Sequence, residues 1–214
     1  DSPGPLERHL ETFYAVSPVP DDWSEAQAAS FLREYNNRGT LDIAVHEAMP
    51  GHYVQIWHSN RYPSVLRAVL GSGSFVEGWA VYAEEMMVGQ GFREDDPLYR
   101  LSQLKVQLRT ITNAIIDQAI HVDGMSREEM MRLLTETAFQ EEREAAGKWR
   151  RAQLSFTQLS TYFVGFQEHW ETLGAARLAW LADFNWKRYH DGILSFGSPP
   201  GRFARQLLLN EPIQ

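Results

Sequence analysis

The sequence contains no cysteine among its 214 residues, which excludes disulfide bonds, thiolate nucleophiles and zinc sites built from thiolates. No apolar run reaches the length of about 18 residues that a membrane-spanning helix needs, so no transmembrane segment is expected. Lys and Arg number 20 against 28 Asp and Glu, and the net charge of −8 argues against nucleic acid as the main partner. Alternation with a period of two residues is absent over any long stretch, which argues against a β-sheet.

Hydrophobic residues are plentiful at 43%, enough for a substantial core. They recur at helical spacing, as in the series Val76, Trp79, Ala80, Ala83 and Met87, so we predict an all-α fold. Residues 1–39 contain four of the ten prolines and are predicted to form a loop-rich segment with short helices. Residues 40–214 are predicted to form one helical domain. Because the chain begins with Asp1 and shows no signal peptide, we expect a processed product or a piece of a longer polypeptide.

Several predicted helix boundaries depend on turn-forming residues. Ser126 and Glu129 have the spacing of a capping box, so a helix is expected to begin there and to end at Gly147. Gly174 is expected to divide two further helices, and the run 36–39 is expected to end an early one.

One segment combines two histidines and a glutamate within an otherwise apolar stretch: His46, Glu47 and His52, with Pro50 and Gly51 between. In metallopeptidases with the pattern His-Glu-x-x-His, the two histidines lie one helical turn apart and hold zinc, and the glutamate is the general base. Here the histidines are six residues apart, which on a regular helix places them about 120° from alignment. They can hold one ion only if the Pro-Gly insert distorts the helix.

A second segment places Glu77 beside Trp79, in the motif Glu-Gly-Trp-Ala-x-Tyr-x-Glu. A carboxylate among apolar neighbours is costly unless a cation pairs with it, and a zinc ion is one such cation. Two histidines and this glutamate would leave a fourth tetrahedral position for water. Other interpretations stay open: His46 could bond a backbone carbonyl, His52 could cap a helix, and Glu77 could pair with Arg or Lys.

The two motifs, in this order, resemble the bacterial domain-of-unknown-function 885 family, which is similar in motif layout to gluzincin-type zinc peptidases. Three downstream segments also resemble that family: residues 117–121, residues 158–165 and residues 184–197. The similarity covers most of the chain from about Thr40 onward. Members of the family are typically longer, so the resemblance implies that this chain corresponds to the C-terminal, motif-bearing part.

The resemblance also implies roles for individual residues. His46, His52 and Glu77 would bind one Zn²⁺ ion, and Glu47 would be the general base. Candidates for donating a hydrogen bond to the oxyanion are Tyr162, His121 and His190. Glu84 and Asp117 would orient a histidine ligand through its other ring nitrogen.

The sequence therefore predicts a zinc-dependent metallopeptidase of gluzincin type that hydrolyses peptide or small amide substrates with metal-activated water. The alternative is a degenerate or structural metal-binding helical domain that serves ligand binding or assembly without catalysis. A missing N-terminal portion of the same protein is a further expected partner. The resemblance alone implies an exported or periplasmic location.

Overall fold

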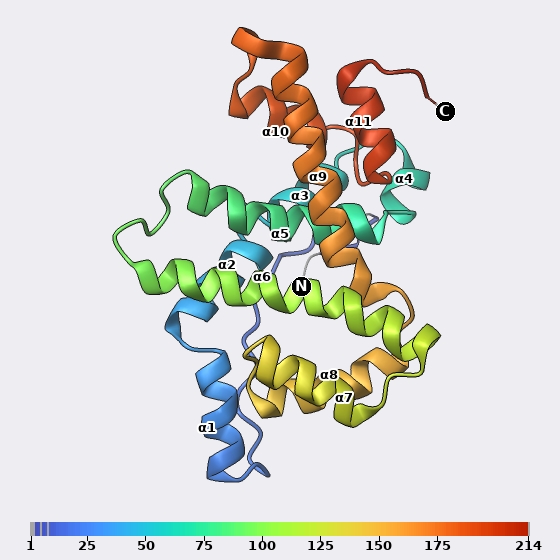
Figure 1. Cartoon of the computed structure of the whole chain (residues 1–214). Helices are drawn as coiled ribbons and strands as arrows, with labels where there is room; N and C mark the ends of the chain where they lie inside the picture. Colours follow the sequence, from blue (N-terminus) through green and yellow to red (C-terminus); the bar gives the residue numbers. More distant parts are fainter. Residues whose placement is uncertain (1–2, 5, 8, 214) are drawn as a thin grey trace. The chain divides into compact units, whose positions relative to one another are not determined.

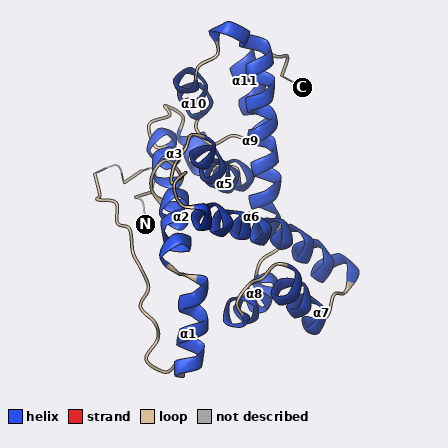
Figure 2. Ribbon diagram, turned by 60° about the vertical axis from the view of Figure 1, so that its left-hand side comes forward, coloured by secondary structure: helices blue, strands red, loops and turns tan. Residues whose placement is uncertain are grey.

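The computed structural model describes residues 3–4, 6–7 and 9–213, and this part of the chain forms helices and loops without a strand (Figures 1 and 2). The all-α prediction is confirmed. Residues 1, 2, 5 and 8 of the predicted N-terminal segment lie outside the described residues, as does residue 214. None of the described helices is both long enough and apolar enough to cross a membrane.

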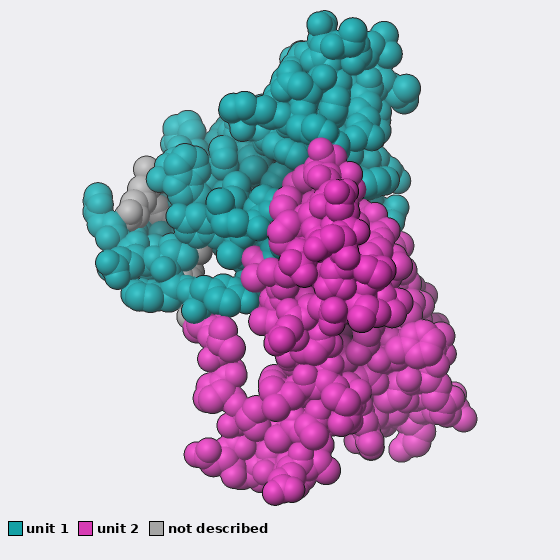
Figure 3. Space-filling view, turned by 90° about the vertical axis from the view of Figure 1, so that its left-hand side faces the viewer, with its two compact units in different colours: residues 1–14, 45–83, 164–214 teal, residues 15–44, 84–163 magenta. Residues whose placement is uncertain are grey.

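The chain divides into two compact units, shown in two colours in Figure 3. Unit 1 comprises residues 1–14, 45–83 and 164–214, and unit 2 comprises residues 15–44 and 84–163. The boundary that the sequence suggested after residue 39 stays a prediction.

Unit 1 contains α3 (His52–Ser59), α4 (Val65–Val69), α10 (Trp186–Leu194), α11 (Gly201–Leu209), the 3-10 turn η3 (Leu181–Asp183), and most of α5 (Gly73–Gly89) and α9 (Gln158–Trp180). Its interior is rich in aromatic side chains. The fully or almost fully buried side chains include Phe75, Trp79, Tyr82, His169 and Tyr189. These residues come from α5, α9 and α10, so the aromatic core joins three helices that are distant in the sequence.

Unit 2 contains α1 (Glu25–Glu34), α6 (Pro97–Gln118), α7 (Arg127–Arg132), α8 (Glu142–Leu154), the π-helical turns η1 (Ala119–Asp123) and η2 (Leu133–Thr137), and most of α2 (Asn37–Glu47). Its core is aliphatic rather than aromatic. The buried members are Ile116, Met130, Leu134, Ala145, Ala152 and Leu159.

The capping box at Ser126 is confirmed, because its hydroxyl accepts from the Glu129 backbone and the Glu129 carboxylate accepts from the Ser126 backbone. The predicted end at Gly147 is wrong: α7 stops at Arg132, and Gly147 lies inside α8. Gly174 likewise lies inside α9. A glycine inside a helix costs only about 1 kcal/mol relative to alanine, which helix packing readily offsets.

The early helix α1 ends at Glu34, just before the run 36–39, as predicted, but α2 already begins at Asn37 within that run. The Asn36 side-chain oxygen accepts hydrogen bonds from the backbone N–H groups of Arg38 (3.0 Å) and Gly39 (3.1 Å). Asn36 therefore caps the start of α2, so the residues that end one helix immediately begin the next.

Candidate metal centre

Three side chains of unit 1 converge at one place. His46 lies near the end of α2, His52 is the first residue of α3, and Glu77 lies in α5. The Glu77 Oε2 atom is 3.3 Å from His52 Nε2 and 3.9 Å from His46 Nε2. One potential donor atom from each of the three lies within 4.8 Å of the others, and the described residues contain no other such group.

The break between α2 and α3 brings the two histidines together. α2 ends at Glu47 and α3 starts at His52, and the two imidazole rings lie 4.7 Å apart at 89°. The Gly51 N–H donates to the Val45 carbonyl oxygen over 3.0 Å. A Cβ atom at Gly51 would lie 1.8 Å from the His46 carbonyl oxygen, so the turn requires glycine at this position.

Glu77 is placed by a close crossing of α5 and α9. A Cβ atom on Gly78 would lie 2.1 Å from the Gly165 carbonyl carbon, and one on Gly165 would lie 1.8 Å from the Ser74 carbonyl oxygen. Both glycines are thus required for the backbones to approach, and the crossing fixes the part of α5 that carries Glu77.

The donor atoms of the three side chains lie close enough together to hold one metal ion, and zinc gives a standard for comparison. Zinc bonds to His nitrogen and carboxylate oxygen are about 2.0–2.2 Å, so tetrahedral donors lie about 3.3–3.5 Å apart. The separation of His52 and Glu77 already has this value, and that of His46 and Glu77 is slightly longer. The three side chains are 14%, 15% and 20% exposed, so the site is sheltered but reachable from solvent. The second ring nitrogen of His52, Nδ1, is buried without a protein hydrogen-bond partner.

Glu47 is the last residue of α2 and is exposed, beside His46 but outside the three-residue group. Tyr14, on the N-terminal segment of the same unit, interacts electrostatically with the Glu47 carboxylate. Burial raises the pKa of the Tyr14 phenol, and the Glu47 carboxylate raises it further. Sequence reasoning missed Tyr14 because it lies in a loop and belongs to no motif.

His190 lies in the aromatic core of unit 1. Its Nε2 atom is 2.8 Å from the Tyr82 hydroxyl, and its ring contacts Trp79 (centroids 5.6 Å apart) and Trp186 (5.4 Å). Burial lowers the pKa of His190 to about 4, so its imidazole is neutral at pH 7. His169, which belongs to no sequence motif, is a buried packing residue whose Nε2 lies 2.9 Å from the Phe75 carbonyl oxygen.

The remaining predicted residues belong to unit 2, and none is part of the three-residue group. Glu84 is buried in α5. His121 Nε2 lies 3.0 Å from the carbonyl oxygens of both Ala152 and Ser155. The Tyr162 hydroxyl oxygen accepts a hydrogen bond from Arg151 over 2.9 Å.

The Asp117 carboxylate caps the start of α9. Its Oδ2 atom accepts from the Ser160 backbone N–H (2.9 Å) and hydroxyl (2.8 Å), and its Oδ1 atom accepts from the Thr157 N–H (3.2 Å). These bonds satisfy donors at the first turn of the helix, where a carboxylate is also favoured by the helix dipole.

Replacing Asp117 with Ala is therefore expected to lower the free energy of unfolding by about 1–3 kcal/mol, because a buried cap and its hydrogen bonds are lost. Urea unfolding followed by circular dichroism measures the change. The exposed Asp123 provides the control, since its replacement by Ala is expected to change stability by less than about 0.5 kcal/mol. Equal urea midpoints for Asp117→Ala and the wild type would show that the cap contributes no stability.

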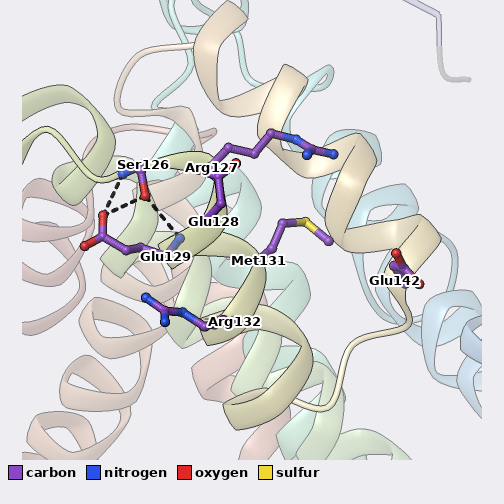
Figure 4. Close-up of a pocket in the computed structure, with 7 residues that line it drawn as sticks. All are labelled: Ser126, Arg127, Glu128, Glu129, Met131, Arg132 and Glu142. Carbon is purple, nitrogen blue, oxygen red and sulfur yellow. Dashed lines mark hydrogen bonds between the residues drawn. The ribbon is translucent and has the colours of Figure 1, made fainter.

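Unit 2 carries a surface groove (Figure 4). It is lined by Ser126, Arg127, Glu128, Glu129, Met131, Arg132 and Glu142. Ser126 and Glu129 are engaged with each other in the capping box. Most of its lining residues belong to the first turns of α7, where charged side chains commonly face solvent. None of them belongs to the metal-ligand group, so we assign the candidate site to that group.

The fold and site define an all-α protein with a candidate metal centre of two histidines and one glutamate. The chain belongs to a family of bacterial proteins of unknown function, DUF885, whose model matches residues 1–208. No match is found among curated proteins.

Two of the solved structures that are similar to the chain are described as lipoproteins. A candidate lipoprotein of unknown function from Shewanella oneidensis has 42% sequence identity and a TM-score of 0.89, over 98% of this chain. A candidate lipoprotein from Colwellia psychrerythraea has 23% identity and a TM-score of 0.79, over 83% of this chain, and shares the fold. The match spans only 38% of the Shewanella chain and 31% of the Colwellia chain.

Proposed function

We propose that this chain carries the catalytic site of a zinc-dependent hydrolase of gluzincin type that cleaves peptide bonds. The observation that supports the proposal most is the convergence of His46, His52 and Glu77, with donor atoms within 4.8 Å and with Glu47 directly next to one ligand. The three residues come from three different helices, so their convergence is not a consequence of local sequence proximity.

The donor set is that of a catalytic rather than a structural zinc site. His46 and His52 would bind through Nε2 and Glu77 through Oε2, which leaves one tetrahedral position without a protein ligand. When bound there, zinc supplies a Lewis acid that polarises a carbonyl group and lowers the pKa of water towards neutrality.

Glu47 is the general base in this proposal. Its carboxylate is exposed at the end of α2, so an oxygen can accept a proton from the attacking water and pass it to the leaving amine nitrogen. Its position outside the ligand group suits this role, because a carboxylate bound to the metal would be a poorer proton acceptor.

His190 is the candidate donor to the oxyanion in unit 1. Burial raises the pKa of Tyr82, so its hydroxyl keeps its proton and can donate to His190 Nε2. The neutral imidazole then carries its proton on Nδ1 and can donate it to a developing negative charge. The catalytic roles of Tyr162 and His121 and the orienting roles of Glu84 and Asp117 stay predictions from the family resemblance.

The second candidate function is a degenerate or structural metal-binding domain used in ligand binding or assembly. It differs from the first in needing no substrate cleft, and the chain spans only 38% of its Shewanella relative. Because these two similar structures are described as candidate lipoproteins, we also propose that the protein is exported.

The test is hydrolysis of a peptide library by the zinc-loaded protein, followed by mass spectrometry. The proposal expects new peptide ends that disappear on chelation and are absent with the His46→Ala variant. An intact library with the fully loaded protein would favour the non-catalytic alternative.

A further inference from the structure

Trp79 connects the two halves of the candidate metal centre. Its indole Nε1–H donates to the Pro50 carbonyl oxygen over 3.0 Å. Pro50 lies in the turn between α2 and α3, directly between His46 and His52 in sequence. Trp79 itself lies in α5, two residues after Glu77. One hydrogen bond thus joins the turn between the two histidines to the helix that contains Glu77.

The direction of this hydrogen bond is fixed by packing. The Trp79 side chain is 1% exposed, and its ring contacts those of Tyr82 (centroids 5.4 Å apart), His190 (5.6 Å) and His169 (5.7 Å). A large ring enclosed in this way cannot rotate without displacing its neighbours, because protein interiors are close-packed. The indole N–H therefore remains directed at the turn.

We propose that Trp79 is a positioning residue of the metal centre, which sets the separation between the histidine pair and Glu77. The inference rests on the proposed zinc site and adds a residue that does not touch the ion. Loss of a hydrogen bond that orients a metal site typically lowers metal affinity or activity about 10–100-fold.

Replacing Trp79 with Phe removes the N–H donor and keeps an aromatic ring in the core. We expect the dissociation constant for Co²⁺, a spectroscopic substitute for Zn²⁺, to rise about tenfold, at the lower end of the range for such hydrogen bonds. We also expect a weaker or shifted visible d–d absorption, because this band reports the ligand geometry. A purely structural role for Trp79 would lower stability and leave the band of the bound ion unchanged.

The control is Trp149→Phe, which removes an indole at a partly buried position next to the aliphatic core of unit 2. It is expected to bind Co²⁺ with the wild-type affinity and spectrum. Wild-type affinity and an unchanged band in Trp79→Phe would overturn the proposal. Failure of the wild-type protein itself to bind Co²⁺ or Zn²⁺ would instead contradict the metal site and would remove the basis for the role of Trp79.

A second measurement does not depend on the folding of the variant. In the wild-type protein, the indole ¹H–¹⁵N signal of Trp79 is expected to shift and to exchange more slowly with solvent when Zn²⁺ is added, because the bound ion holds the turn. A signal that Zn²⁺ leaves unchanged while it binds stoichiometrically would also overturn the proposal.

Discussion

Replacement of Glu47 by Gln is expected to lower the rate of peptide hydrolysis at least about 100-fold, the lower end of what general base catalysis contributes. Gln has the same shape but cannot accept the proton of the attacking water. Zinc binding is expected to stay at the wild-type level, because Glu47 lies outside the ligand group. Kinetics on a cleaved library peptide, together with zinc analysis of the same samples, measure both quantities.

The matched control is Glu136→Gln, which removes an exposed carboxylate of unit 2 and is expected to leave the rate unchanged. A Glu47→Gln enzyme that is as fast as the wild type would show that another group accepts the proton. A variant that has lost zinc would show that Glu47 supports the metal site rather than the proton transfer.

The replacement of Gly51 by Ala is the second change with a large expected effect. The added methyl group would lie 1.8 Å from the His46 carbonyl oxygen and 2.5 Å from that of Val45. Both contacts are to backbone, so the turn must move, and His52 moves with it. We expect the affinity for Zn²⁺ to fall at least about 100-fold, since metal sites are sensitive to small displacements of their ligands. Titration against a competing chelator measures this affinity.

Gly147→Ala is the control for the glycine change itself. Gly147 lies in the interior of α8, and a Cβ atom there would meet nothing within 4 Å. This variant should bind zinc normally and should be more stable by about 0.5–1 kcal/mol, because alanine is the better helix former. Normal zinc affinity in Gly51→Ala would mean that the turn adapts and that its glycine is not needed for the site.

The spacing of apolar residues was sufficient to predict the all-α class and the core position of Trp79, because helical periodicity is local. The three candidate ligands were also predicted from local motifs. Their convergence depends on the break in the helix at Pro50 and Gly51. The direction in which the chain continues after this break is set by tertiary contacts. From the sequence we could therefore predict only that a distortion was required.

Other features could not be predicted, for physical reasons that particular residues illustrate. The contact of Tyr82 with His190 joins residues that are 108 positions apart, and the influence of Glu47 on Tyr14 depends on the course of a loop. The predicted helix end at Gly147 was wrong because packing outweighs the small local preference of a single glycine.

The most direct test of the account is the zinc content of the purified protein, measured by elemental analysis beside a His46→Ala variant. The account predicts about one zinc ion per chain in the wild type, because three protein ligands hold one ion. It predicts much less zinc in the His46→Ala variant. Absence of zinc from both proteins, even after zinc is added at neutral pH, would contradict the assignment of His46, His52 and Glu77 as metal ligands.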